Sequence, residues 1–240
     1  MPTAIVTGGS KGLGKALATE LARQGWSLVI DGRDGTVLDA SATEMTLLAQ
    51  GAGASLVAIP GSVTDAGHRH ELVAAARHLG ALDLLVNNAS TLGPSPLPAL
   101  ADYPLEALRA VFETNVVAPL ALTQAALPLL RSSTRGRVLD VTSDAAVEAY
   151  PGWGGYGASK AALEQLSAVL AAEETQLRVW WLDPGDLRTE MHQLAFPGED
   201  ISDRPPPEDV APLLAALVAS DLPSGRYRAA DLASLTGARQ

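Results

Sequence analysis

Short apolar runs rich in β-branched residues recur along the chain and predict strands. They cover residues 3–7, 27–31, 55–59, 83–87, 137–142 and 178–183, with a weaker seventh run at 225–230. These runs are almost continuously apolar rather than alternating with polar residues. That pattern is typical of parallel strands that are buried on both faces of a sheet.

Between the runs, apolar residues recur at the three- and four-residue spacing of helices. The first such stretch follows the first strand directly and carries Leu13, Leu17 and Leu21 on one face. The other clear stretches are alanine-rich and cover residues 66–79, 105–131 and 157–173. Strands that alternate with helices of this length predict an α/β fold, a doubly wound parallel sheet with helices on both faces.

No flexible linker, charge block or repeat divides the chain, so residues 1–240 are predicted to form a single domain. The one proline-rich segment, DRPPPED at 203–209, comes late and precedes a single further helix. We interpret it as the end of a surface insertion at about 190–207, which is long and polar enough to form a lid over a substrate.

The composition narrows the range of partners. The 240 residues include 27 acids against 17 Lys and Arg, a net charge of −10 that argues against nucleic acid and anionic membranes. No apolar run approaches the length of about eighteen residues that a membrane span needs, and no signal peptide is evident. We therefore expect a cytoplasmic protein. The chain has no cysteine, and its histidines form no ligand constellation, so no metal site is predicted.

A glycine-rich turn joins the first strand to the first helix, with the sequence TGGSKGLG at 7–14. Glycines permit a tight turn and a close backbone approach to a pyrophosphate, and a helix N-terminus adds free N–H groups. The spacing differs from the G-x-G-x-x-G of longer dinucleotide-binding enzymes, so the turn alone is equally compatible with a tight turn that binds nothing.

A second signal is the pair Tyr156 and Lys160, four residues apart on a predicted helix. Four tyrosines and three lysines in 240 residues give an expectation of about 4 × 3/240 = 0.05 such pairs by chance. Side chains at this spacing share a helix face, and a neighbouring ammonium lowers the pKa of a phenol. The pair would suit a general acid for a carbonyl oxygen, although a simply solvated lysine is the alternative.

The chain resembles the short-chain dehydrogenase/reductase family over most of its length. The similar segments, in chain order, are the turn at 7–14, NNAS at 87–90, Asn115 in FETNVVAPL, Ser143 thirteen residues before Tyr156, and PGDLRT at 184–189. The resemblance implies a single-domain Rossmann fold with a seven-stranded sheet and an NAD(P)-dependent oxidoreductase. Ser90 stands where the family usually has glycine.

The resemblance also implies roles for particular residues. Tyr156 would donate a proton to a substrate carbonyl, or remove it from an alcohol, and Ser143 would bind the same oxygen. Lys160 would bind the nicotinamide ribose and lower the pKa of the tyrosine. Asn115 would interrupt its helix and hold a water, and Thr189 would orient the carboxamide. The cofactor positions are Gly8, Ser10, Lys11, Gly12, Leu13, Gly14, Arg33, Ser62, Val63, Asn88, Ala89, Tyr156, Lys160, Pro184, Gly185 and Thr189.

Two arguments about the cofactor oppose each other. Asp31 lies about 20 residues after the glycine-rich turn, where an acid binds the ribose 2′-OH of NAD(H). Alignment with the family instead places Gly32 at the discriminating position and Arg33 after it, where relatives hold the 2′-phosphate of NADP(H). Because Lys11 adds a second cation, we favour NADP(H), with NAD(H) as the alternative.

Other functions remain open. A non-catalytic NADP(H)-binding sensor, or an imine or enone reductase, would share this scaffold. The acids Asp144, Glu148, Asp183 and Asp186 fall near the expected substrate pocket, where they would either attract a cationic substrate or be solvated carboxylates. The partner is predicted to be a small-molecule carbonyl or alcohol. Ala- and Leu-rich helices around Asn115 and Tyr156 favour a homodimer, and the polar C-terminal sequence puts a homotetramer in doubt.

Overall fold

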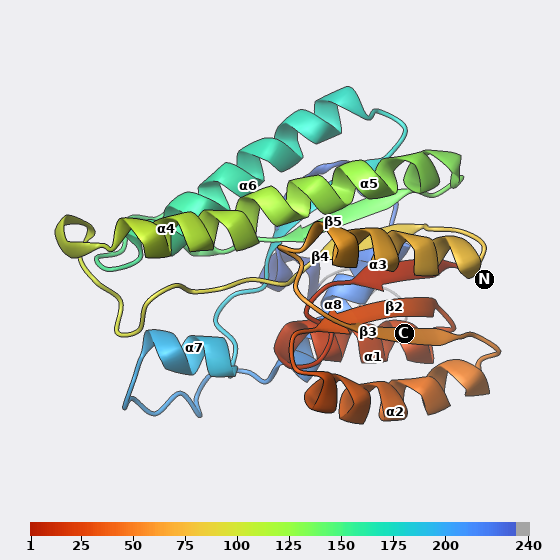
Figure 1. Ribbon diagram of the computed structural model, residues 1–240, viewed down its shortest axis with the longest axis horizontal. Coiled ribbons are helices and arrows are strands. Elements are labelled where there is room, and N and C mark those ends of the chain that lie inside the picture. The colour runs from red at the N-terminus through yellow and green to blue at the C-terminus, as the bar shows by residue number, and fades with distance from the viewer. Residues whose placement is uncertain (234–240) are drawn as a thin grey trace.

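All seven expected strands lie in one parallel sheet in the order β3-β2-β1-β4-β5-β6-β7 (Figure 1). The computed structural model describes residues 1–233. The strands are β1 (Thr3–Val6), β2 (Ser27–Gly32), β3 (Leu56–Pro60), β4 (Leu84–Asn87), β5 (Arg137–Val141), β6 (Arg178–Asp183) and β7 (Gly225–Arg228). The strand order reverses between β1 and β4, so their carboxyl ends form the switch point at which doubly wound sheets bind ligands.

Helices cover both faces of the sheet, as the sequence predicts (Figure 1). One face carries α1 (Gly12–Arg23), α2 (Gly35–Gly51) and α8 (Pro207–Ala219). The other face carries α3 (Ala66–His78), α4 (Leu105–Phe112), α5 (Ala118–Ser132) and α6 (Gly154–Glu173). The pattern of apolar residues did not single out α2.

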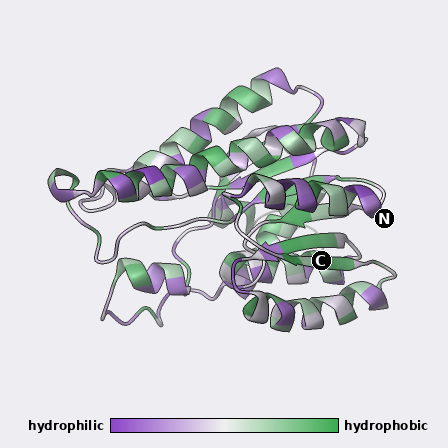
Figure 2. Ribbon diagram, in the orientation of Figure 1, coloured by the Kyte–Doolittle hydropathy of each residue, from purple (hydrophilic) through white to green (hydrophobic). Residues whose placement is uncertain are grey.

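Two hydrophobic clusters hold these layers together, one on each face of the sheet. Leu17 of α1 and Leu214 of α8 pack against one face, and Leu72 of α3 and Leu122 of α5 against the other, all of them at most 1% exposed. Burying a side chain of this size contributes about 1.5–3 kcal/mol. Figure 2 shows the strands between the two layers as the most uniformly hydrophobic part of the chain.

The segment 105–131 is not one regular helix. It consists of α4, a π-helical turn η2 (Glu113–Val117) and α5. By length and composition alone, the whole stretch Leu105–Ser132 is long and apolar enough to cross a membrane. No membrane span was predicted from the sequence, because it contains no uninterrupted apolar run of that length. The core helices of globular proteins also pass this test. Here Leu122, Ala126 and Leu130 of α5 are buried in the hydrophobic cluster on that face of the sheet.

The expected lid contains a short helix, α7 (Glu190–Ala195), followed by a loop that leads to α8. In Figure 1, α7 projects beyond the carboxyl ends of the strands, on the same side of the molecule as α4. The segment is anchored at two points, since the Ser95 hydroxyl donates to Leu194 O (2.6 Å) and Arg188 N donates to Pro205 O (2.9 Å). The lid therefore stands next to the switch point of the sheet.

Candidate active site

One large cavity, of about 1260 Å³, opens at the carboxyl ends of the strands. Its walls come from the glycine-rich turn, the loops after β2, β3, β4, β5 and β6, the start of α6, and α7. Of the residues that the sequence assigned to catalysis or to the cofactor, all line this cavity except Gly14 and Asn115. The fold therefore brings together positions that are up to 181 residues apart in the sequence (Gly8 and Thr189).

The glycine-rich turn has the conformation that a phosphate site requires. Gly8 and Gly12 have φ angles of +66° and +56°, which residues other than glycine rarely adopt. A Cβ on Gly14 would lie 2.3 Å from Gly8 O and 2.4 Å from Asn88 Nδ2, so only glycine fits beneath the turn. No side chain caps the N-terminus of α1, which leaves its first N–H groups free. This arrangement fits the pyrophosphate of a dinucleotide.

Thr7 and Asn88 fasten this turn to the neighbouring strand. Asn88 Nδ2 donates to Thr7 O (2.8 Å), and the Thr7 hydroxyl oxygen accepts from the backbone N–H of Asn88 (3.0 Å) and of Ala89 (3.1 Å). The sequence analysis assigned no role to Thr7. Its place as the first residue of the glycine-rich turn was the available signal.

Asp31 is 2% exposed, and the protein itself occupies both of its carboxylate oxygens. Oδ1 accepts from Gly8 N (2.6 Å), and Oδ2 lies 3.0 Å from Nε2 of His68, which is also buried. The carboxylate thus supports the first glycine of the turn. Sequence reasoning missed His68 because the two partners are 37 residues apart in the sequence.

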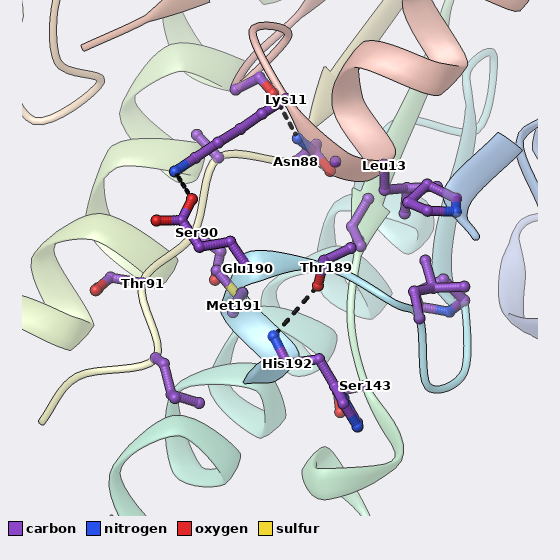
Figure 3. Close-up of a pocket in the computed structure, with 18 of the residues that line it drawn as sticks. Lys11, Leu13, Asn88, Ser90, Thr91, Ser143, Thr189, Glu190, Met191 and His192 are labelled. Atoms are coloured by element: carbon purple, nitrogen blue, oxygen red, sulfur yellow. Dashed lines mark hydrogen bonds and ion pairs between the residues drawn. The ribbon is translucent and has the colours of Figure 1, made fainter. Parts of the chain in front are cut away.

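Arg33 and Lys11, the two cations expected at the cofactor ribose, differ in their surroundings. Arg33 is exposed, lines the cavity, and forms no ion pair with a residue in the described part of the chain. The adjacent carboxylate of Asp34 instead caps α2 by accepting from Thr36 N (2.9 Å) and Val37 N (3.2 Å). Lys11 is paired with Glu190 of α7 and lowers the pKa of that carboxyl (Figure 3). The Lys11 ammonium is therefore already paired with a carboxylate, whereas the sequence suggested a cation available to NADP(H).

The Tyr156–Lys160 pair lies near the start of α6 and lines the same cavity as the glycine-rich turn. Tyr156 is 9% exposed and Lys160 is 2% exposed. The ammonium nitrogen lies 5.6 Å from the centre of the phenol ring and donates to Val141 O (2.7 Å). Ser143 reaches the same wall from the end of β5. Its segment packs tightly on α6, since a Cβ on Gly157 would lie 2.5 Å from Ala145 O.

The expectation that the pKa of Tyr156 lies below its ordinary value is wrong for this structure. Burial and the carboxylates of Asp183 and Asp144 raise the pKa of Tyr156, and they outweigh the hydroxyls of Ser143 and Ser90, which lower it. Burial also lowers the pKa of Lys160 to about 8, against the opposing effect of the Asp140 carboxylate. A phenol in this state is protonated near neutral pH and can donate a proton.

Asn115 lies within the π-helical turn, in agreement with the expected interruption of its helix. Its Nδ2 donates to Thr91 O (2.9 Å) and to the Ser159 hydroxyl (3.0 Å), and its Oδ1 accepts from Thr91 N (2.8 Å) and the Ser90 hydroxyl (3.1 Å). The amide thereby joins the loop after β4 to α6. Asn115 supports the cavity wall rather than lining it.

Asp140 is a buried acid behind the catalytic wall, and sequence reasoning did not single it out. It is 4% exposed and accepts from Asn87 Nδ2 (2.7 Å) and the Ser167 hydroxyl (2.6 Å). Burial raises its pKa, and its charge in turn favours the protonated form of Lys160. The sequence did hold a signal for Asp140, because an acid inside an apolar strand is rare unless it has hydrogen-bond or charge partners.

The substrate end of the cavity is aromatic and acidic. Trp153 contacts Tyr156 edge to face with ring centres 5.8 Å apart, and it contacts Phe196 at 6.0 Å. Asp144 lies at the same end and accepts a hydrogen bond from the Tyr150 hydroxyl (3.0 Å). Within residues 1–233, no group of three or more His, Asp or Glu residues could hold a metal ion.

Comparison with known proteins agrees with this geometry. Residues 2–200 match the model of the short chain dehydrogenase family. The chain is 37% identical over 175 residues to the short chain dehydrogenase asqE of Emericella nidulans, covering 71% of this chain and 64% of asqE. It is 32% identical to the Escherichia coli oxidoreductase YciK, covering 90% of this chain and 86% of YciK. A short chain dehydrogenase from Shigella flexneri, solved as a complex with NADP, superposes with a TM-score of 0.87 at 30% identity, covering 95% of this chain and 97% of that one.

The fold and the site thus define a Rossmann-type oxidoreductase of the kind that uses a nicotinamide dinucleotide. The chain belongs to the short-chain dehydrogenase family.

Proposed function

We propose that this protein reduces a carbonyl compound to an alcohol with NADP(H), or catalyses the reverse oxidation, with Tyr156 as the general acid and base. The observation that carries the proposal is the single cavity shared by Tyr156, Ser143, Lys160 and the glycine-rich turn. A proton donor therefore faces the same space as a phosphate-binding turn. A dehydrogenase requires this arrangement, and a simple binding module does not.

When bound at the glycine-rich turn and Thr189, the cofactor would supply the hydride for the carbonyl carbon in the reductive direction. The Tyr156 hydroxyl supplies the proton to the carbonyl oxygen, so that one alcohol forms and a phenolate remains. The raised pKa of Tyr156 keeps the phenol protonated before the reaction. The Lys160 ammonium, 5.6 Å from the ring centre, then stabilises the phenolate. The Ser143 hydroxyl binds the same oxygen as its charge develops.

The environment of Asp31 supports a preference for NADP(H) over NAD(H). A buried carboxylate whose two oxygens already contact Gly8 N and His68 is poorly placed to bind a ribose hydroxyl. The Arg33 guanidinium lines the cavity, forms no ion pair with a described residue and acts on the Glu190 carboxylate only through its charge, so it suits a 2′-phosphate. Thr189 and the backbone near Ser62 and Val63 also line the cavity, at positions suited to the carboxamide and the adenine.

The test is turnover of a panel of carbonyl, imine and enone compounds with NADPH and NADH in parallel. We expect NADPH-dependent reduction of carbonyls, and a loss of about 10²–10⁴-fold in kcat in Tyr156→Phe. Tyr227→Phe is the matched control, because the Tyr227 hydroxyl donates to Pro223 O outside the cavity. Tight NADPH binding without turnover of any compound would favour the sensor instead, and products from imines or enones alone would favour the other chemistries.

We also propose that the chain forms a homodimer through the helices around the catalytic wall. Leu105, Val117 and Leu120 lie on this continuous helical stretch and are 65%, 47% and 37% exposed, so it presents apolar side chains to solvent. Light scattering during gel filtration tests the proposal, and a monomer at micromolar concentration would contradict it. The cytoplasmic location stays a prediction from the sequence.

A further inference from the structure

The carboxylate of Asp144 lies directly beside the catalytic serine and has no cation to balance it. The Ser143 hydroxyl donates to Asp144 Oδ1 (3.0 Å), and Ala145 N donates to the same oxygen (2.8 Å). The Tyr150 hydroxyl donates to Oδ2 (3.0 Å). All three donors are neutral, and no cation in the described part of the chain forms an ion pair with Asp144.

The neighbouring acids Asp183 and Asp186 are different, because each forms an ion pair with an arginine, although both arginines are shared with a further acid. Arg226 lies 3.5 Å from Asp183 and 3.0 Å from Glu164. Arg204 lies 3.5 Å from Asp186. Of the lining acids Asp144, Asp183 and Asp186, Asp144 is therefore the one that forms no ion pair within the described part of the chain.

This charge opposes the reaction that the site is built for. In the reductive direction negative charge develops on the carbonyl oxygen, and Ser143 must donate its hydrogen to that oxygen. Here the hydrogen is already donated to a carboxylate, and the same carboxylate would repel the developing charge. The negative field also reaches the phenol, since Asp144 is one of the groups that raise the pKa of Tyr156. A positive charge bound at Asp144 would relieve both effects.

A second, independent feature indicates that a polar ligand group belongs in this part of the cavity. His192 of α7 lines the cavity with a side chain that is only 9% exposed, and its Nε2 atom has no hydrogen-bond partner. Its ring packs against Phe196 (centres 4.9 Å apart), which in turn contacts Trp153. Aromatic walls next to a carboxylate favour alkylammonium groups through cation–π attraction.

We propose that the substrate carries an ammonium group a few bonds from the reacting carbonyl, and that Asp144 binds this group. The proposal rests on the proposed carbonyl reduction and specifies its substrate class. Pairing with the ammonium engages the carboxylate, releases the Ser143 hydroxyl for the carbonyl oxygen, and offsets the repulsion. Asp144 thus acts as a specificity residue, and it favours amino ketones over neutral ketones of the same shape.

Two shape-matched ketones test this proposal. 5-(Trimethylammonio)pentan-2-one cannot cyclise, and 6,6-dimethylheptan-2-one replaces its charged nitrogen with carbon. We expect kcat/KM with NADPH to be at least about ten-fold higher for the ammonium ketone, a difference of ~1.4 kcal/mol. In Asp144→Asn this preference should disappear, because the ammonium ketone becomes slower and the neutral ketone becomes equal or faster.

Glu148→Gln is the matched control, because it removes one negative charge from an exposed residue of the same segment that does not line the cavity. It should keep the preference. Equal kcat/KM values of the wild-type protein for the two ketones would overturn the proposal and leave the carbonyl reductase intact. A preference that survives in Asp144→Asn, or that is also lost in Glu148→Gln, would overturn it as well.

Calorimetry separates this proposal from the proposed function. If neither ketone is reduced with NADPH or NADH, the failure counts against carbonyl reduction. Binding of the ammonium ketone still decides the role of Asp144. We expect its Kd to be at least about ten-fold lower than that of the neutral ketone in the wild-type protein, and equal to it in Asp144→Asn. Equal Kd values in the wild-type protein would overturn the assignment.

Discussion

The two ends of the cavity are built in different ways. At the cofactor end, backbone groups and glycines form the surface, and buried hydrogen bonds such as that of Asp31 to Gly8 N fix its shape. At the substrate end, side chains from the segments after β5 and β6 form the surface. Among them, within the described residues, are the carboxylate of Asp144, which forms no ion pair, and His192, whose Nε2 has no hydrogen-bond partner. The shape of the cofactor end is thus fixed by the backbone, whereas the properties of the substrate end depend on the charges of its side chains.

This difference teaches where substitutions should act. At the glycine-rich turn of the cofactor end they should change shape, and so affect stability and cofactor binding together. At the substrate end they should change charge, and so affect the choice of substrate with little effect on folding. The four predictions that follow test this division, beginning with the largest expected effect.

Gly14→Ala should damage the cofactor end most. Its Cβ would lie 2.3 Å from Gly8 O, and a backbone atom cannot move away cheaply. We expect overpacking of ~3 kcal/mol, which corresponds to a Tm lower by roughly 6–12 °C. If the free energy of NADPH binding falls by the same amount, the Kd of NADPH rises roughly 100-fold. Gly51→Ala is the control, since nothing lies within 4 Å of its Cβ. Normal NADPH affinity in Gly14→Ala, measured by calorimetry, would contradict the account.

Arg33→Gln should change cofactor choice without changing the shape of the site. Loss of charged hydrogen bonds to a 2′-phosphate costs about 1.5–3 kcal/mol, or roughly 10–100-fold in the Kd of NADPH. The Kd of NADH should stay the same. Arg23→Gln, which removes an arginine paired with Glu20 outside the cavity, should leave both cofactors unaffected. Equal losses for NADPH and NADH would show that Arg33 does not distinguish them.

The pH dependence of reduction should report Lys160. Its pKa of about 8 means that the ammonium is lost as pH rises through that value, so kcat/KM should fall there. The Asp140 carboxylate raises the pKa of Lys160, and Asp140→Asn should therefore move the midpoint to lower pH. The exposed Glu173, changed to Gln, should leave the midpoint in place. A midpoint that stays or rises in Asp140→Asn would refute this link between the two groups.

Glu190→Gln should produce the smallest effect, at the point where the two ends of the cavity meet. It frees Lys11 from its exposed ion pair and leaves its ammonium available to a phosphate. Exposed pairs are weak, so we expect the Kd of NADPH to fall by roughly two- to five-fold at low salt and less at high salt. Glu44→Gln breaks the comparable pair with Lys15 outside the cavity and serves as the control. Weaker NADPH binding in Glu190→Gln would mean that the pair itself builds the site.

The sequence allowed the architecture to be predicted, because apolar strands and helical spacing are local patterns. It also predicted which residues would meet at the cavity, through motifs that keep their order along the chain. It did not reveal the pairing of Asp31 with His68, or that of Lys11 with Glu190, since these partners are 37 and 179 residues apart. The pKa of Tyr156 was predicted in the wrong direction, because burial and Asp183 depend on the folded surroundings.

Asp144 shows which features of a residue can be predicted from the sequence and which depend on the folded structure. Its position next to Ser143 was visible in the sequence, and so was the possibility of a cationic substrate. The sequence did not show that Asp144 and Glu148 lack an ion pair within residues 1–233 and that only Asp144 of these two lines the cavity, because Arg226 and Arg204 reach Asp183 and Asp186 only in the folded chain. The charge of a side chain can be read from the sequence, but whether a cation pairs with it depends on the fold.

The most direct test of the central claim is a single-turnover experiment on preformed NADPH complexes of the wild-type protein and Tyr156→Phe. The account predicts Kd values for NADPH that agree within about two-fold, because the cofactor end is built independently of the phenol. It also predicts that NADPH oxidation on mixing with a ketone is at least about 100-fold slower in Tyr156→Phe. Equal oxidation rates in the two proteins would contradict Tyr156 as the proton donor, and with it the proposed function.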